Sequence, residues 1–295
     1  MNCPCESGLK SSECCLRHDG AWYKTPESFT PPQPKTGFSH PHCYLRHTED
    51  CSTSLSDEHY VSEAALRSVD NILRVTGVPW LRPGEYKDIP AGRFYSRILC
   101  TRHNIAFSTI DNQGCRFIKW IKMFCNSSSS PPQLFTLFNG LDIERWCLKV
   151  FLCLLFSSNL QVAPGNIIRK VKNTRRMVDL LFGKIPDEWG RGFWIRTDTE
   201  LIVDTKRSLS VSPISKPGTN RLFGLTINMF GFDFLYSTAP INVETSVFRP
   251  SQIIFRLPKG DLKIEISWPS FLVHSGVIEW NLAGRQKLTQ HNSSV

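Results

Sequence analysis

The sequence predicts an α+β protein in which two cysteine-rich segments precede a larger helical and β-rich domain. Four of the 11 cysteines lie within the first 15 residues, and three more lie between residues 40 and 103. An apolar stretch with the length of a buried helix spans residues 141–157. From Phe193 onward the chain is rich in β-branched and aromatic residues between turn signals, which is typical of antiparallel strands.

Length, charge and hydropathy exclude some classes of protein. The 295 residues suffice for two domains and a small appendage, and a net charge of +9 favours polyanionic partners such as nucleic acid. The longest apolar run, residues 146–156, contains Lys149 and is too short for a bilayer, so we expect no membrane contact. Because the N-terminus lacks an apolar signal region, we expect a cytoplasmic protein whose cysteines are not disulfide-bonded.

The first cysteine-rich segment contains two close pairs, Cys3 with Cys5 and Cys14 with Cys15. Zinc prefers four tetrahedral sulfur or nitrogen ligands, and metal binding would fold a segment too short to bury a core. The sequence CPCESGLKSSECC resembles the zinc-binding motif at the C-terminus of the SecA translocase (the SEC-C motif), with Glu6 replacing that family's first glycine. The resemblance implies a zinc knuckle over residues 1–18 that stabilises the chain or docks a protein partner. The alternative is four ordinary reduced thiols.

Two breaks in composition divide the rest of the chain. Residues 19–39 contain four prolines between short polar stretches and are predicted to be a linker. Residues 126–133 begin with the low-complexity sequence NSSSSPP and are predicted to be a second linker. These breaks give a central domain at 40–125 and a C-terminal domain at 134–295.

The central domain contains cysteines, histidines and acids in a distinctive order: Cys43, Cys51, Glu58-His59, Cys100, His103-Asn104 and Asp111. This order resembles the HNH nucleases, a family of treble-clef (ββα-metal) proteins, over residues 40–112. The resemblance implies a treble-clef domain with a second structural zinc site, whose ligands would be Cys43, Cys51, Cys100 and His103. Seven residues separate the first two cysteines where two is common, so His42 or His47 could replace one ligand.

The same resemblance implies a catalytic site. His59 would be the general base that activates water, and Asn104 would fix the loop that carries it. Glu58 would help to hold a magnesium or manganese ion or would orient its water, and Asp111 stands about where the family has its last metal ligand. Phosphodiester cleavage needs a base of suitable pKa and a cation that neutralises developing charge. A hard ion accepts carboxylate oxygens and leaves the thiolates to zinc. Ser62 stands near where the family has a proline, which weakens the likeness at this position.

Each of these residues also has a purely structural interpretation. The acids at residues 57 and 58 could begin a helix over the following AALRSV stretch, where negative charge suits the helix dipole. Asp111 could cap a helix over residues 112–122. Cys100 and His103 could be a chance pair. The remaining four cysteines are expected to be small buried hydrophobes: Cys115, Cys125, Cys147 and Cys153.

Basic side chains are the candidates for phosphate contact: Arg102, Arg116, Lys119, Lys170, Lys172, Arg175 and Arg176. The last four belong to a second predicted helix over residues 165–181. Lysine and arginine clusters bind phosphate without reading base sequence, although such a cluster can equally be a solvated helix face.

The C-terminal domain offers no catalytic constellation. Asn139 is predicted to cap the helix over residues 141–157, with Trp146 packed inward and Glu144 paired with Arg145 at the surface. The aromatic residues of the strands are expected to form a sheet core.

The function predicted from these residues is a metal-dependent endonuclease that cleaves DNA, with a role in defence against foreign DNA by family analogy. One alternative is a non-catalytic zinc module that binds nucleic acid or a protein. Another is an adaptor whose N-terminal knuckle docks a partner. A nuclease predicts that its four catalytic residues converge in an open cleft beside basic residues. A binding module predicts two zinc sites and a buried or capped His59.

Overall fold

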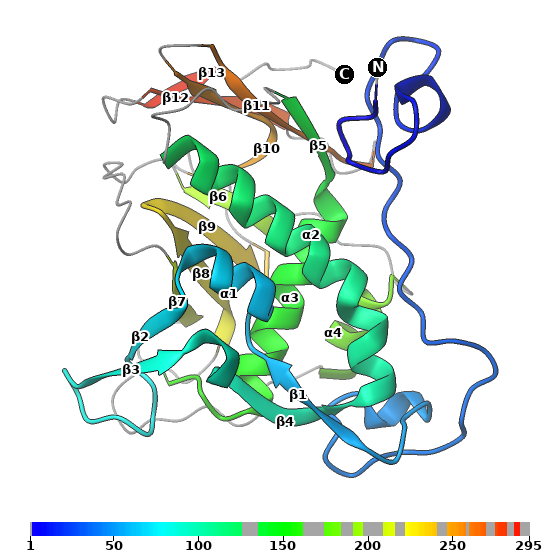
Figure 1. Cartoon of the computed structure of the whole chain (residues 1–295), viewed down its shortest axis with the longest axis vertical. Coiled ribbons are helices and arrows are strands. Elements are labelled where there is room, and N and C mark those ends of the chain that lie inside the picture. The colour runs from blue at the N-terminus through cyan, green and yellow to red at the C-terminus, as the bar shows by residue number, and fades with distance from the viewer. Residues whose placement is uncertain are drawn as a thin grey trace.

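A computed structural model describes residues 2–125, 135–161, 174–183, 191–196, 209–215, 222–240, 247–257, 260–269, 275–281 and 286–289. Over these residues the chain is a mixed α and β protein with two small sheets and one large sheet (Figure 1). Within the described parts of the chain, no helix combines the length and apolarity needed to cross a membrane.

The central segment is built on a hairpin and a long helix. Strands β1 (Leu55–His59) and β4 (Tyr95–Cys100) pair antiparallel, and α2 (Thr101–Cys125) begins directly after β4. Between the two strands lie α1 (Glu63–Val69) and a separate hairpin of β2 (Ile72–Thr76) and β3 (Tyr86–Pro90). Three short 3-10 helices lie in the N-terminal part of the described chain: η1 (Ser11–Glu13), η2 (Arg46–Thr48) and η3 (Ala91–Arg93).

Both capping alternatives for the acids of this segment are wrong. Glu58 lies on β1, and the helix that follows is capped by Ser62, whose Oγ accepts a hydrogen bond from the Ala65 N–H at 3.4 Å. Asp111 lies in the middle of α2, because that helix starts at Thr101 rather than at residue 112. Neither Glu58 nor Asp111 therefore lies at a helix terminus.

Helix α3 (Gly140–Phe156) is buried on nearly all sides. Its predicted N-cap is confirmed, because Asn139 Oδ1 accepts a hydrogen bond from the Leu141 N–H at 2.9 Å. The predicted surface pair of Glu144 with Arg145 is wrong. Glu144 is buried and pairs with Arg249 at 2.9 Å, since the large sheet covers that face of the helix. The described part of the second predicted helix is α4 (Thr174–Leu181).

The large sheet has nine strands, and it is mixed rather than purely antiparallel. Strand β10 pairs parallel with β12, and β5 pairs parallel with β11, whereas the other pairings are antiparallel. Alternating hydrophobicity reveals a strand but not its direction, so the sequence did not predict the two parallel pairings. The strands are β5 (Phe135–Asn139), β6 (Gly192–Arg196), β7 (Leu209–Ser215), β8 (Leu222–Met229), β9 (Phe232–Ser237), β10 (Val247–Arg256), β11 (Leu262–Ser267), β12 (Ser275–Asn281) and β13 (Gln286–Thr289).

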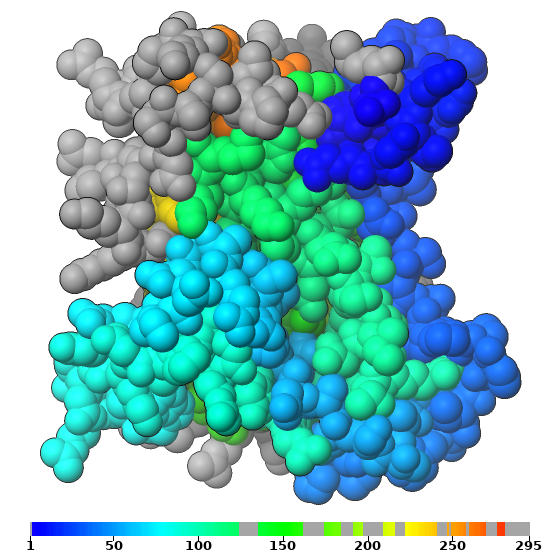
Figure 2. All heavy atoms as spheres, viewed as in Figure 1, coloured from blue at the N-terminus to red at the C-terminus, as the bar shows by residue number. Residues whose placement is uncertain are grey.

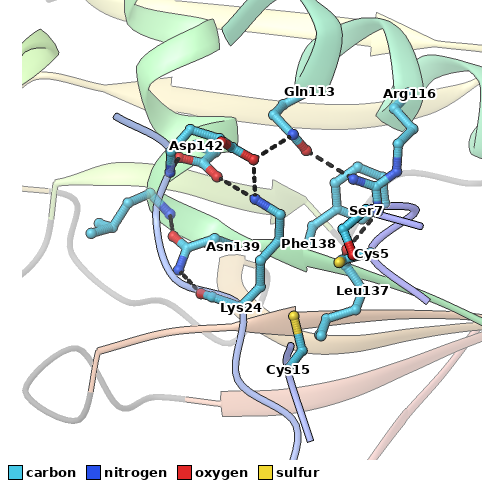
Figure 3. Close-up of polar contacts among 12 residues, drawn as sticks. Cys5, Ser7, Cys15, Lys24, Gln113, Arg116, Leu137, Phe138, Asn139 and Asp142 are labelled. Carbon is cyan, nitrogen blue, oxygen red and sulfur yellow. Dashed lines mark hydrogen bonds and ion pairs between the residues drawn. The ribbon is translucent and has the colours of Figure 1, made fainter. Parts of the chain in front are cut away.

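One continuous hydrophobic core joins the two predicted domains, with members from Phe29 to Trp280. The segment 19–39 therefore differs from the expected linker, because it packs against the C-terminal part of the chain. Lys24 is buried and its Nζ lies 3.1 Å from Asp142 Oδ2, while its backbone N–H donates to Ser267 Oγ at 3.2 Å (Figure 3). The second predicted linker, 126–133, lies outside the described residues.

Candidate metal centres and a buried acidic site

The four N-terminal cysteines form a compact group that could hold a metal ion. Their sulfur atoms all lie within 4.8 Å of one another, and Cys14 is the exposed member. Glu6, which stands where the resembled motif has glycine, adopts the left-handed backbone region with φ of 63°. Glycine enters this region without cost, so the resemblance and the backbone agree about the turn.

The thiols of this group differ, because burial raises the pKa of Cys3 and of Cys15 while that of Cys5 is lowered. Burial raises the pKa of Cys5, but hydrogen bonds from Ser7 and Cys3 outweigh it and lower the pKa to about 7. The thiolate is the form that binds metal, so a lowered pKa favours binding.

The knuckle, residues 2–15, is docked on its own chain. Glu6 Oε1 lies 3.3 Å from Arg116 Nε and accepts a hydrogen bond from Trp120 Nε1 at 3.0 Å. The Pro4 carbonyl accepts a hydrogen bond from the Leu137 N–H at 3.3 Å. Figure 3 shows Arg116 of α2 beside the chain that carries Cys5 and Ser7. One face of the knuckle is therefore occupied by α2 and β5.

The second group is formed by Cys43, Cys51, Cys100 and His103, and all four side chains are buried. His103 Nδ1 lies 3.7, 3.8 and 3.1 Å from the sulfur atoms of Cys43, Cys51 and Cys100. These are the residues that the sequence named as ligands, and this group includes neither of the two alternative histidines, residues 42 and 47.

A hydrogen-bond chain behind His103 orients its ring. His103 Nε2 lies 3.1 Å from Thr48 Oγ1, and that hydroxyl donates to the Leu45 carbonyl at 2.8 Å. Because the hydroxyl proton is used on Leu45, the proton between Thr48 and His103 belongs to Nε2. The Nδ1 lone pair is then left facing the three sulfur atoms, which is the arrangement of a histidine metal ligand.

The pKa values of the thiols in this group are shifted in opposite directions. Hydrogen bonds from the Cys43 thiol and from the His103 backbone N–H lower the pKa of Cys100 despite its burial, whereas the hydrogen bond with Cys100 and burial raise the pKa of Cys43. A bound cation would displace the remaining thiol protons, because thiolate is the ligating form. The group connects the loop around η2 with the start of α2, and so holds the β1–β4 hairpin against that helix.

Beyond this group lies a buried acidic site that joins three elements. Lys149 of α3 places its Nζ 2.6 Å from Glu58 Oε1 of β1 and 2.6 Å from Asp111 Oδ2 of α2. The side chains of Glu58 and Lys149 are 1% and 2% exposed, and that of Asp111 is 18% exposed. The HNH resemblance implies one site for both acids, whereas Lys149 stands out in the sequence only as a charge within an apolar run. A lone lysine in a buried helix requires acidic partners, and that signal could have identified it.

The acidic site, defined as Glu58, Lys149 and Asp111, contains two acids and one base. Burial raises the pKa of Glu58, and Lys149 only partly offsets this. Burial would lower the pKa of Lys149, but the carboxylates of Asp111 and Glu58 raise it. Asp111 Oδ1 is buried and has no hydrogen-bond donor among the residues that the structure describes. A buried anionic oxygen without a partner is a place where a water molecule or cation would bind.

The other two predicted catalytic residues lie on β1 and α2, the elements that carry Glu58 and Asp111. His59 follows Glu58 on β1, has a side chain 17% exposed, and lies 3.6 Å from Glu63 Oε2. Its Nε2 is buried and makes no hydrogen bond. Asn104 lies in the first turn of α2 and is half-buried. The structure thus brings Glu58 and Asp111 together on Lys149, in a site that is largely buried rather than an open cleft.

The predicted phosphate-binding residues fall into three groups. Arg102 and Arg116 have partners within the chain: Arg102 Nε lies 2.9 Å from Asp50, and Arg116 pairs with Glu6. Their guanidinium groups therefore act in folding rather than as free cations. Lys119, Arg175 and Arg176 are exposed. Lys170 and Lys172 lie outside the described residues.

The geometry of these sites is the basis for assigning a function to the chain. The two cysteine-rich groups could each hold a metal ion, and the acidic site joins β1, α2 and α3. No family model matches the chain, and neither curated proteins nor solved structures give a significant match.

Proposed function

We propose that this chain is a zinc-stabilised nuclease that hydrolyses the phosphodiester bonds of DNA with the help of a divalent cation. The observation that carries the proposal is the acidic site. Two carboxylates from different elements share one ammonium group, and the buried Asp111 Oδ1 has no partner. A buried site with more acids than bases, on a hairpin and helix that also carry candidate metal ligands, is suited to hold a cation.

Zinc fits both cysteine-rich groups. Three thiols and one imidazole, or four thiols, are the usual donor sets of structural zinc sites. The Thr48 hydroxyl behind His103 supplies the outer hydrogen bond that such a ligand uses. We assign the hairpin β1–β4 and helix α2 to a treble-clef unit on this basis, as the HNH resemblance implies.

A hard divalent ion, magnesium or manganese, fits the acidic site because the donors are carboxylate oxygens and one of them lacks a partner. Glu58 and Asp111 would hold it, and it would supply Lewis-acid stabilisation of charge on the phosphate. His59 is adjacent to Glu58, and its Nε2, 3.6 Å from Glu63 Oε2, has no hydrogen-bond partner among the described residues, so it would take the proton of the attacking water. Lys149 offsets the charge of one of the two carboxylates until the cation binds.

A second candidate is a non-catalytic zinc module that binds nucleic acid or a protein partner. It is favoured by the burial of Glu58 and by Lys149, whose ammonium group already contacts both carboxylates. An adaptor role for the knuckle is less well supported, since α2 and β5 occupy one of its faces.

Cleavage by matched variants tests the proposal. We would incubate plasmid and single-stranded DNA with the wild type, His59→Ala and His42→Ala, each with magnesium or manganese. His42 is exposed and lies outside the acidic site, so its variant is the control. We expect cleavage by the wild type and His42→Ala, and a loss of about 10²-fold or more in His59→Ala, as for removal of a general base. Zinc-loaded wild type that cleaves neither DNA would refute the nuclease and favour the binding module.

A further inference from the structure

The β2–β3 hairpin forms a separate two-stranded sheet that presents large apolar side chains to solvent. Ile72, Trp80 and Tyr86 are 52%, 50% and 58% exposed, although aromatic side chains normally gain by burial. In Figure 2 this hairpin is the cyan projection at the lower left of the molecule. Exposed aromatic residues on a small sheet mark a surface that contacts a partner.

The exposed residues share an arrangement on the hairpin. Arg74 pairs with Asp88 across the strands, and its guanidinium lies 4.1 Å from the centre of the Tyr86 ring. Side chains alternate between the two faces of a strand, so Ile72 and Arg74 lie on the same face. Because Arg74 contacts the Tyr86 ring, Tyr86 belongs to this face as well. The Tyr86 ring is thereby held at the surface with one face covered by Arg74.

The turn that carries Trp80 is fixed by residues after α3. Trp80 Nε1 donates to Asn159 Oδ1 at 3.1 Å, and Gln161 Nε2 donates to the Gly77 carbonyl at 2.8 Å. These contacts hold the indole in one place while half of its surface stays open. A pre-positioned ring loses little entropy when it stacks on a planar ligand.

The charges around the hairpin favour an anionic ligand. Both acids of the hairpin are engaged, Asp88 by Arg74 and Glu85 by the Arg82 backbone N–H at 2.9 Å. Within the described part of the chain, the exposed side chains of Arg82, Lys87 and Arg93 have no ion-pair or hydrogen-bond partner. The hairpin therefore combines free cations with two open aromatic rings.

We propose that the β2–β3 hairpin is a binding surface for single-stranded nucleic acid, with Tyr86 and Trp80 stacking on unpaired bases and the free cations facing phosphates. Aromatic residues beside basic ones are how proteins hold a single strand without reading its sequence. Helix α1 joins His59 to this hairpin, so on the proposed nuclease function the strand held here would be the one that is cleaved.

Binding measured without cleavage tests this surface separately from the nuclease. Fluorescence anisotropy with a labelled 20-nucleotide oligo-dT and with a duplex of equal length would be recorded without added divalent ions, and the oligonucleotides checked for integrity afterwards. We expect the affinity of the full-length chain for oligo-dT to fall at least about fivefold in Tyr86→Ala and in Trp80→Ala. Tyr86→Phe should bind as the wild type, because the ring is kept.

The matched control is Ile72→Ala, which removes an equally exposed side chain without a π face and should change the affinity by less than about twofold. Unfolding temperatures of all variants would show that the fold is retained. Wild-type affinity in both alanine variants, a preference of the wild type for duplex, or no binding to either oligonucleotide would overturn the inference. Binding that depends on the two rings would stand even if the chain cleaved nothing.

Discussion

Replacing Lys149 with methionine removes the ammonium group between Glu58 and Asp111 while keeping a side chain of similar length. In the wild type this group lies 2.6 Å from an oxygen of each acid, and it is 2% exposed. The variant leaves Glu58, which is 1% exposed, beside a second carboxylate without a cation.

The expected loss in the free energy of unfolding follows from this burial. Stranding one member of a buried ion pair costs about 3–5 kcal/mol. Asp111 is partly exposed and can be solvated, so we expect a value near the lower limit, about 3 kcal/mol at pH 7. Burial already raises the pKa of Glu58, and losing Lys149 raises it further. A carboxyl with a raised pKa in the folded state contributes stability that is present below its unfolded pKa and is lost as the pH rises.

Urea denaturation at pH 5 and pH 8 measures both effects. Lys149→Met should be closer to the wild type at pH 5 than at pH 8, because Glu58 can fold in its protonated form at the lower pH. The double variant with Glu58→Gln should recover much of the loss, since it removes the stranded charge. A loss below about 1 kcal/mol at pH 8, or a double variant less stable than the single one, would refute this reasoning.

Three further changes test the scaffold of the metal centres. Thr48→Val removes the acceptor for His103 Nε2, so we expect about tenfold weaker metal retention in a chelator titration. Unchanged retention would show that Thr48 does not orient the His103 ring. Glu6→Gln removes the charge that faces Arg116, so trypsin should cut the first 20 residues faster at an unchanged metal content, and equal rates would show that the pair does not hold the knuckle. Asn139→Ala removes the cap of α3 and should lower the free energy of unfolding by about 1 kcal/mol or more in urea denaturation, and no loss would contradict the capping contact.

The two cysteine-rich groups could be predicted from the sequence because their signals are chemical as well as local. In a chain that is expected to lack disulfides, cysteine pairs at short spacing indicate metal binding. The structure brings the four N-terminal thiols together, and it brings three further thiols together with His103. The cap of α3 was likewise readable from Asn139 alone, since a cap depends on neighbouring residues.

Features that depend on distant partners could not be predicted in this way. Lys149 interrupts an apolar run, and only the fold shows that Glu58 and Asp111 neutralise it. Glu144 looked like a surface residue because its partner, Arg249, is about a hundred residues away. Directions of the paired strands and the packing of residues 19–39 are also long-range properties, which no local pattern records.

The metal content of the purified wild-type chain tests the account most directly, because both the knuckle and the hairpin–helix unit depend on it. We predict that elemental mass spectrometry finds two zinc ions per chain in the wild type. We predict one zinc ion per chain in Cys5→Ser and one in His103→Ala. One ion that survives in His103→Ala would place zinc in the knuckle alone and contradict the metal-clamped unit. A chain that folds with no zinc would contradict both centres.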